Sequence, residues 1–381
     1  MLVKASRAFP ALILTGPRRA GKTTLLRNLF PGASYILMED PDLLARFRDD
    51  PRTFLDDIRP PAILDEIQNV PEILSYLRSR IDSHPARKGQ WFLTGSQEVP
   101  LMRGATESMA GRAAVFQLLP FSVIETGKTT LLKGGFPEVL ARPSDYRTWY
   151  SSYLQTYLEK DVRTIAAIRH LSTFRKFLSI LSSRCGKILN RTDIAAPLGV
   201  SVPTVSEWLN ILEITAQIIL VPPFFENFGK RLVKSPKLYF MDSGLACHLL
   251  GIESEQALGR SPFLGPLFEG FVASEIIKSQ INSGRRREIY HFRDQQGLEV
   301  DFVVPTGDER LVLIEAKASR SVAPESAEPL LRLARTSGRY RTKCVVIHRR
   351  ADSDPPFSAI RPGASAASLT ELPEILKSGG R

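Results

Sequence analysis

A glycine-rich segment near the start of the chain has the residues and the spacing that bind a phosphate. Residues 16–24, GPRRAGKTT, match the pattern G-x-x-x-x-G-K-T. Glycines let backbone N–H groups turn toward a phosphate, and the N-terminus of a following helix adds its positive end. The Lys22 ammonium would reach the β- and γ-phosphates of a nucleotide, and the Thr23 hydroxyl would bind Mg²⁺. The alternative is a glycine-rich turn without a ligand. The predicted cofactors are ATP and Mg²⁺, and the predicted nucleotide-binding residues are Gly16, Pro17, Arg18, Arg19, Ala20, Gly21, Lys22, Thr23 and Thr24.

Two acidic residues end a later apolar run, in the manner of a Walker B strand. Residues 62–66 have the sequence AILDE. Ligands of open α/β sheets bind at the carboxyl ends of the strands, where these acids would lie. Asp65 would hold Mg²⁺, and Glu66 would orient or deprotonate the attacking water. The alternative is that the pair caps the helix after Pro71.

Two further residues are candidates for a catalytic role. Ser96 follows the apolar run WFL, where a polar side chain can touch the γ-phosphate or the attacking water, and Thr94 is the alternative. Arg112, in the segment SMAGRA, is a candidate arginine finger that acts on the nucleotide of a neighbouring subunit. The alternative for Arg112 is a surface or DNA-contacting side chain. The predicted catalytic residues are Lys22, Glu66, Ser96 and Arg112.

A second group of charged residues interrupts apolar segments nearer the C-terminus. Asp301 lies within EVDFVV, and Glu315 and Lys317 are two apart in LIEAK, which places both on one face of a strand. Such carboxylates can hold Mg²⁺, and the lysine can orient a hydroxide for phosphodiester attack. Glu269, in preference to Glu275, would complete this candidate metal and nuclease site, which resembles the D…E-x-K arrangement of the PD-(D/E)xK nuclease fold. The alternative is a structural remnant in which the acids pair with Lys317 or nearby arginines.

The elements around the phosphate-binding segment predict an α/β domain with a parallel sheet. Short apolar runs alternate with segments of helical periodicity, which is the pattern of a parallel sheet covered by helices. The expected strands are 12–14, 34–38, 62–64, 91–93 and 114–118, and the expected helices are 23–29, two pieces within 41–58, and 68–80.

The middle of the chain predicts helices followed by a winged helix-turn-helix. Helical patterns cover 146–163, 174–183 and 202–214, a shorter helix begins at 190, and a strand follows at 218–221. In a DNA-binding role the second helix would face a groove, while basic residues before it would contact phosphates. The alternative is packing between domains. The groove-facing candidates are Ser201, Thr204, Ser206 and Asn210, and the phosphate-contacting candidates are Arg184, Lys187 and Arg191.

The C-terminal region predicts an α/β domain like that of restriction endonucleases. A helix is expected at 264–282, strands at 288–292, 298–305, 311–316 and 343–348, and a helix at 326–335. The predicted domains are a P-loop ATPase domain over 1–133, a helical lid and winged helix over 134–225, a nuclease-like domain over 226–350 and a mobile tail over 351–381.

The composition and net charge of the chain indicate which kind of partner and which cellular compartment to expect. The chain has 381 residues and a formal net charge of +11, which predicts several domains and a polyanionic partner such as DNA. The alternative is a surface whose charge serves solubility alone. The three cysteines are far apart and form no C-x-x-C, so neither a disulfide framework nor a zinc site is indicated. No signal peptide or bilayer-spanning run is evident, so we expect a cytoplasmic protein without a membrane partner.

Two parts of the chain resemble known domains. The segments LTGPRRAGKTTLL, ILDEIQNVPE, FLTGSQ, MAGRA and LLPFS resemble the AAA_14 module of AAA+ ATPases. The segments LYFMDSGLACHLLG, LFEGFVASEI, HFRDQQGLEVDFVV and LIEAKAS resemble the domain of unknown function DUF4143. Only residues 1–11 precede the first predicted strand, so the segment that usually covers the adenine is expected to be short.

The resemblance implies an AAA+ ATPase with a winged helix and a nuclease-like domain that acts on DNA. Together with the motifs, it predicts an ATPase that couples Mg-ATP hydrolysis to the binding or remodelling of DNA, with branched or junction DNA as a candidate substrate. It also implies a homo-oligomer, such as a hexameric ring. Two alternatives stay open. One is an ATP-gated, Mg²⁺-dependent DNA endonuclease, and the other is a nucleotide-dependent signalling switch that acts through protein partners.

Overall fold

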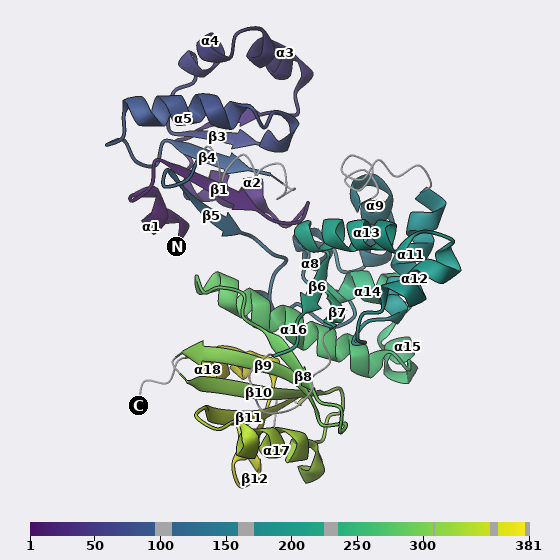
Figure 1. The fold of residues 1–381 in the computed structure, drawn as a ribbon. Helices are drawn as coiled ribbons and strands as arrows, with labels where there is room; N and C mark the ends of the chain where they lie inside the picture. Colours follow the sequence, from purple (N-terminus) through teal and green to yellow (C-terminus); the bar gives the residue numbers. More distant parts are fainter. Residues whose placement is uncertain (96–108, 159–170, 225–234, 308, 351–356, 378–381) are drawn as a thin grey trace. The chain divides into compact units, whose positions relative to one another are not determined.

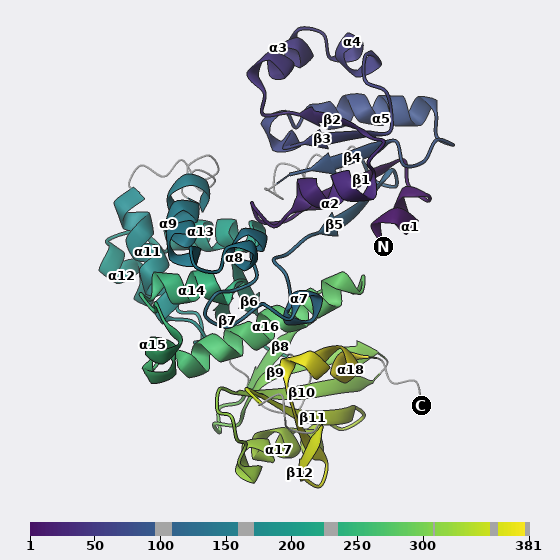
Figure 2. The same cartoon turned by 180° about the vertical axis from the view of Figure 1, so that it is seen from behind.

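The computed structural model describes residues 1–95, 109–158, 171–224, 235–307, 309–350 and 357–377 (Figures 1 and 2). The chain folds into two compact units: unit 1 comprises Met1–Pro120 and Ile214–Ala216, and unit 2 comprises Phe121–Glu213 and Gln217–Arg381. The four domains predicted from the sequence, with boundaries after residues 133, 225 and 350, stay a prediction. Over the described ranges, no helix has the length and apolar character that crossing a bilayer requires.

Unit 1 is built on a parallel sheet of five strands in the order β2-β3-β4-β1-β5. Every residue of β1, β3 and β4 is buried, as is usual for central strands with both faces covered. This confirms the predicted parallel α/β sheet. The strands are β1 (Ala11–Thr15), β2 (Ser34–Leu37), β3 (Ala62–Asp65), β4 (Trp91–Thr94) and β5 (Ala113–Gln117).

Helices cover both faces of this sheet. Ala11 and Ile13 of β1 pack into one core cluster, and Leu12 and Leu14 pack into another, because successive side chains of a strand point to opposite faces. The first cluster includes residues of α5 and the second includes Leu26 of α2, so the two helices lie on opposite faces (Figure 1). The helices are α1 (Leu2–Ser6), α2 (Lys22–Leu29), α3 (Pro41–Asp49), α4 (Pro51–Asp56), α5 (Ile73–Ser83) and the 3₁₀ turn η1 (Ile67–Asn69).

The break between α3 and α4 was predicted, but the start of α5 was not. Asp40 and Asp50 each cap one helix by accepting hydrogen bonds from two backbone N–H groups. The next helix was expected at 68–80, whereas α5 begins at Ile73. Pro71 accounts for the difference, because proline lacks the N–H that a continuous helix from residue 68 would use.

The first part of unit 2 is helical and ends in a two-stranded antiparallel sheet of β6 and β7. The rings of Phe174 and Phe177 on α11 pack edge-on against Trp208 on α13. The helix expected at 146–163 continues as a π-helix after Tyr153, and its last part lies outside the described residues. The elements are α7 (Val123–Thr126), α8 (Pro137–Ala141), α9 (Tyr146–Tyr153), η2 (Leu154–Leu158), α11 (Leu171–Ser183), α12 (Arg191–Leu198), α13 (Val202–Ile214), β6 (Ile218–Val221), β7 (Lys237–Phe240), α14 (Ser243–Leu249) and α15 (Glu255–Arg260).

The buried carboxylate of Asp242 joins three segments of unit 2. It accepts hydrogen bonds from the backbone N–H of Gly135 at 2.8 Å, from the backbone N–H of Leu245 at 3.0 Å, and from the Tyr150 hydroxyl. Gly134 has φ +70°, and a Cβ added there would lie 2.2 Å from a carboxylate oxygen of Asp242. Gly134 is therefore required by the close approach of this side chain, whereas a Cβ added at Gly135 would lie 2.1 Å from the carbonyl oxygen of Phe121.

The second part of unit 2 is a sheet of six strands in the order β12-β13-β11-β10-β9-β8 (Figure 2). Strands β8, β9 and β10 are antiparallel neighbours, and β10 pairs with β11 in parallel. The helix α16 spans the predicted residues and is buried along most of its length. The elements are α16 (Leu264–Asn282), β8 (Tyr290–Arg293), β9 (Glu299–Gly307), β10 (Arg310–Lys317), η3 (Pro324–Ala327), α17 (Glu328–Thr336) and β11 (Arg341–His348).

Within the tail predicted to be mobile over 351–381, residues 358–376 form regular elements, and the mobility of the tail stays a prediction. Strands β12 (Ser358–Arg361) and β13 (Ala364–Ala367) complete the sheet, and the turn η4 (Leu369–Glu371) and helix α18 (Leu372–Leu376) follow. The Ser- and Ala-rich composition does not indicate a strand, but β13 pairs with β11 in parallel, and Ala366 and Ala367 are buried there. Residues 351–356 and 378–381 lie outside the described part of the chain.

Candidate active site

The predicted phosphate-binding loop joins the carboxyl end of β1 to the start of α2. Gly16 has φ +134°, and a Cβ added there would lie 2.0 Å from the carbonyl oxygen of Leu118. Gly21 has φ +97° and occupies the N-cap of α2. Both positions require glycine, one for close backbone contact and one for left-handed geometry at the helix start.

Lys22 is buried against this loop, with only 5% of its surface exposed. Its Nζ donates hydrogen bonds to the carbonyl oxygens of Gly16 and Pro17, each at 3.0 Å. A buried ammonium requires anionic or carbonyl partners. Its place inside the loop therefore fits a group that binds phosphate.

Asp65 ends β3 and accepts hydrogen bonds from three hydroxyl groups. The distances to its Oδ2 are 2.8 Å from Thr23 Oγ1 and 2.7 Å from the Tyr35 hydroxyl, while Thr94 Oγ1 donates to Oδ1. The structure thus brings together Thr23 and Asp65, the two predicted metal ligands. A carboxylate beside a hydroxyl is a donor set that Mg²⁺ prefers, so these residues fit the metal.

Tyr35 is a site residue that the sequence analysis missed. It lies on the edge strand β2, whose register places Tyr35 opposite Ile63 and Leu37 opposite Asp65. Burial, and then the hydrogen bond to Asp65, raise the pKa of the Tyr35 hydroxyl, so it remains a donor at neutral pH. Strand pairing was the signal that could have predicted Tyr35. A strand that pairs with β3 in parallel must bring one of its side chains near Asp65, at the acidic end of β3.

Glu66 follows Asp65 in a left-handed conformation, with φ +58°. Its carboxylate accepts a hydrogen bond from Gln68 Nε2, and its carbonyl oxygen accepts one from Asn69 Nδ2 at 3.0 Å. Its backbone N–H donates to Thr94 Oγ1 at 3.3 Å. The carboxylate therefore lies at the same edge of the sheet as the phosphate-binding loop, with an amide that orients it.

Of the other two predicted catalytic residues, the structure describes only Arg112. Ser96 lies outside the described residues. Arg112 precedes β5, which runs parallel to β1, so it lies at the amino edge of the sheet while the loop follows the carboxyl edge. Its guanidinium donates two hydrogen bonds to Asp82, at 2.6 and 3.0 Å, which lower the pKa of that carboxyl.

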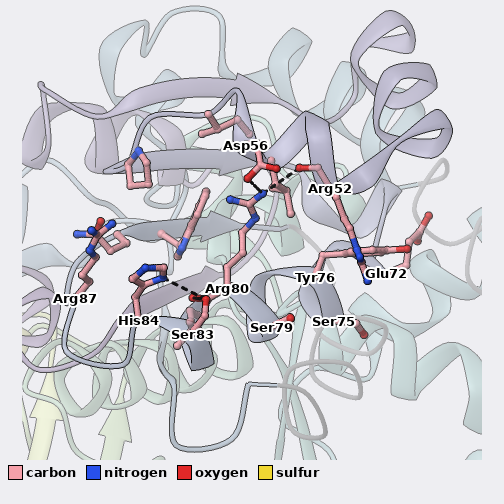
Figure 3. Close-up of a pocket in the computed structure, with 16 residues that line it drawn as sticks. Arg52, Asp56, Glu72, Ser75, Tyr76, Ser79, Arg80, Ser83, His84 and Arg87 are labelled. Atoms are coloured by element: carbon pink, nitrogen blue, oxygen red, sulfur yellow. Dashed lines mark hydrogen bonds and ion pairs between the residues drawn. The ribbon is translucent and has the colours of Figure 1, made fainter.

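A cavity of about 910 Å³ lies at this opposite, amino edge of the sheet (Figure 3). Pro60 and Gln90, which precede β3 and β4, line it together with residues of α4 and α5. Arg80 lies in the cavity wall and donates hydrogen bonds to Asp56 and to the carbonyl oxygen of Arg52. The cavity is therefore separate from the phosphate-binding loop.

Family models match residues 8–127 as an AAA domain (AAA_14), residues 124–256 as a domain of unknown function (DUF8612), and residues 264–361 as another (DUF4143). Uncharacterised proteins of Mycobacterium bovis and Mycobacterium tuberculosis are each 32% identical over 311 residues, which cover 80% of this chain and 69% of theirs. The chain belongs to the AAA_14–DUF4143 family of P-loop ATPases.

A Walker-type ATPase of Pyrococcus abyssi is also similar in structure, at 16% identity and a TM-score of 0.42, over 65% of this chain and 93% of that one. The sequence-based recognition of the AAA_14 and DUF4143 domains is confirmed by the family models. The middle segment matches a third model that the sequence analysis did not name.

In the DUF4143 region the four predicted acid and lysine residues lie together, but a second lysine lies among them. Lys237 Nζ on β7 is 2.8 Å from Glu269 Oε1, 3.3 Å from Asp301 Oδ1 and 2.7 Å from Glu299 Oε1. Lys317 Nζ is 2.7 Å from Glu315 Oε1. We call the residues Glu269, Glu299, Asp301 and Glu315 the acid cluster.

Two carboxyl groups of the acid cluster, those of Glu269 and Glu315, have raised pKa values. Burial, followed by the charge of Asp301, raises the pKa of Glu269 to about 8 and that of Glu315 to about 7. Burial acts to lower the pKa of Lys237, but the charges of Glu269, Asp301 and Glu299 outweigh it and raise that pKa. The cluster therefore keeps its lysine charged at neutral pH.

Glu275, the residue not preferred for the acid cluster, has a different place. Its Oε2 accepts a hydrogen bond from the backbone N–H of Val123 at 2.8 Å, and its Oε1 is 3.0 Å from Lys278 Nζ. The glutamate therefore binds the start of α7 to α16. This contact is structural and lies apart from the acid cluster.

Proposed function

We propose that this chain binds Mg-ATP at the phosphate-binding loop and hydrolyses it. The observation that carries the proposal is the hydrogen bond between Thr23 and Asp65, because it joins the loop to the acidic end of β3 with Glu66 next in the chain. Membership of a P-loop ATPase family supports the same chemistry.

Each residue of this edge has a distinct task in the proposal. Lys22 and the loop amides hold the phosphates, and Thr23 and Asp65 hold Mg²⁺, which when bound neutralises charge on the phosphates. Glu66 orients the attacking water and takes its proton. Tyr35 donates to Asp65 Oδ2, the oxygen that Thr23 also contacts, and so holds this carboxylate when the Thr23 hydroxyl turns to the metal. Ser96 stays the proposed contact to the γ-phosphate.

Nucleotide binding by Lys22→Ala tests the loop. We expect this variant to lose affinity for ATP, because the loop then has no ammonium to counter the phosphate charge. The matched control is Lys88→Ala, since Lys88 belongs to the same unit and donates only to the carbonyl oxygen of Pro85 among the described contacts. Unchanged ATP affinity in Lys22→Ala would contradict the assignment.

We further infer that ATP hydrolysis is coupled to the binding or remodelling of DNA, with branched or junction DNA as the candidate. The net charge of +11 supports a polyanionic partner. The order of elements in unit 2 supports a winged helix: α11, then Ile188 bridged to Lys237, then α12, α13, β6 and β7. Ser201, just before α13, and Asn210 on α13 are exposed, as are Lys187 and Arg191 before the helix.

The coupling is tested by ATP hydrolysis with duplex, single-stranded and four-way junction DNA over a range of salt concentrations. We expect one DNA structure to stimulate turnover, with an effect that falls as salt rises. Lys187→Ala with Arg191→Ala should weaken the stimulation. Arg332→Ala, an exposed arginine on α17, is the control. A rate of ATP hydrolysis that none of these DNA structures changes would favour the signalling switch instead.

We also propose that the chain acts as a homo-oligomeric ring, with a hexamer as the predicted form. The position of Arg112 supports this, because it lies at the edge of the sheet opposite its own phosphate-binding loop. An arginine finger at that edge would act on the nucleotide bound by a neighbouring subunit.

A further inference from the structure

The acid cluster of the DUF4143 region already contains a cation. We propose that the Lys237 ammonium is the resident cation of this cluster and takes the place of the divalent metal that the nuclease-like fold implies. The native chain then binds no Mg²⁺ at Asp301 and does not cleave DNA there.

The contacts of Lys237 saturate its donors. An ammonium has three N–H groups, and three carboxylates of the acid cluster lie within 2.7–3.3 Å of Nζ. The Lys237 side chain is only 3% exposed, so water cannot replace these partners. A cation this deeply buried is stable only where acids surround it, and these acids need it in turn.

The carboxylates have few oxygens left for a metal. Asp301 Oδ1 contacts Lys237, and Asp301 Oδ2 accepts a hydrogen bond from the backbone N–H of Ala316 at 3.0 Å. Glu269 Oε1 accepts from both Lys237 and the Tyr239 hydroxyl. Among the described residues, no group of three His, Cys, Asp or Glu side chains is arranged to hold a metal ion.

Lys317, the lysine that would orient a hydroxide in a nuclease, also forms an ion pair with a residue of the acid cluster. Its Nζ pairs with Glu315 Oε1 at 2.7 Å, while Glu315 Oε2 is buried and has no hydrogen-bond partner within the described residues. That unpaired oxygen is a ligand position still open. The residues therefore do not fit a divalent metal while Lys237 is present, although they would fit one without it.

Lys237 also joins separate parts of unit 2. It belongs to β7 of the two-stranded sheet, while its partners belong to α16 and to β9 of the six-stranded sheet. The same ammonium that excludes the metal therefore ties the winged-helix elements to the C-terminal sheet. This gives the cluster a structural task in place of a catalytic one.

Mn²⁺ binding to the full chain, followed by electron paramagnetic resonance without nucleotide, tests the proposal. In the native chain we expect no bound Mn²⁺ that is lost on Asp301→Asn. In Lys237→Met, which keeps the length of the side chain but removes its charge, we expect a new Mn²⁺ site and a rise in unfolding temperature on adding Mn²⁺. Asp301→Asn in that background should abolish both. Lys317→Met is the matched control and should gain no site.

Lys237→Met leaves buried carboxylates without their cation, so it can fail to fold. The variant Lys237→Met with Glu269→Gln carries one less negative charge and keeps Asp301 and Glu315 for the metal test. The native arm is also decisive on its own. Asp301-dependent Mn²⁺ binding by the native chain, or Mg²⁺-dependent DNA cleavage that Asp301→Asn removes, would overturn the proposal. Neither result bears on ATP hydrolysis at the phosphate-binding loop.

Discussion

Replacing Tyr35 by phenylalanine removes one hydroxyl from the predicted metal site and leaves its ring in place. The ring also lies 5.0 Å from the Arg27 guanidinium, a contact that phenylalanine keeps. The hydroxyl is one of three that donate to Asp65, at 2.7 Å from Oδ2. If Thr23 turns toward Mg²⁺, Asp65 in the variant is held by Thr94 alone.

The size of the effect follows from the charge of the acceptor and the exposure of the donor. Hydrogen bonds to charged groups contribute roughly 1.5–3 kcal/mol. Tyr35 is 39% exposed, and solvent screening reduces this contribution to about 1 kcal/mol. That value corresponds to about a fivefold change in an equilibrium constant. We therefore expect the Mg²⁺ concentration for half-maximal ATP hydrolysis to rise about fivefold.

The assay is steady-state ATP hydrolysis at saturating ATP with Mg²⁺ varied. We expect kcat at saturating Mg²⁺ to change less than the half-saturating concentration, because Tyr35 positions the carboxylate and does not touch the reacting atoms. Tyr76→Phe is the matched control. Its ring packs edge-on against Phe47, and its hydroxyl has no hydrogen bond among the described residues. An unchanged or lowered Mg²⁺ requirement in Tyr35→Phe would refute the reasoning.

Three further predictions concern other parts of the chain. Arg112→Ala should lower turnover without lowering ATP affinity, and mixing it with Lys22→Ala protein should restore part of the activity if the arginine acts in trans. Asp242→Ala should destabilise unit 2 by about 2 kcal/mol or more in urea unfolding, because it leaves the buried N–H groups of Gly135 and Leu245 without their acceptor, while the Tyr150 hydroxyl keeps the carbonyl oxygen of Lys133. Burial lowers the pKa of His291 to about 4, so only the unfolded chain binds this proton between about pH 6.5 and 4. The stability of the native chain relative to His291→Gln should therefore fall by up to about 3 kcal/mol as pH drops through that window, and a pH-independent difference would contradict it.

The sequence predicted the first unit well because its signals are local. The loop from Gly16 to Thr24 and the acids at 65–66 need only a strand before them and a helix or turn after them, and the structure has both. The parallel sheet follows from the alternation of apolar runs and helices. The start of α5 was predicted too early. The helical periodicity extends back to residue 68, but Pro71 prevents one continuous helix from beginning there.

The contacts that were missed are distant in sequence. Tyr35 reaches Asp65 only because β2 pairs with β3, and Lys237 reaches Glu269 and Asp301 only because β7 packs against α16 and β9. The spacing of residues along the sequence does not predict contacts between side chains that lie so far apart in the chain. The strands β12 and β13 were missed for a related reason. The small residues of β13 are not typical of a strand, and they form one because β13 pairs with β11.

We propose that Glu66 activates water for ATP hydrolysis at the edge formed by Lys22, Thr23 and Asp65. The most direct measurement compares ATP affinity and turnover of the native chain with those of Glu66→Gln. We expect the variant to bind Mg-ATP as the native chain does and its turnover to fall by about a hundredfold or more. Equal turnover in the two proteins would contradict it.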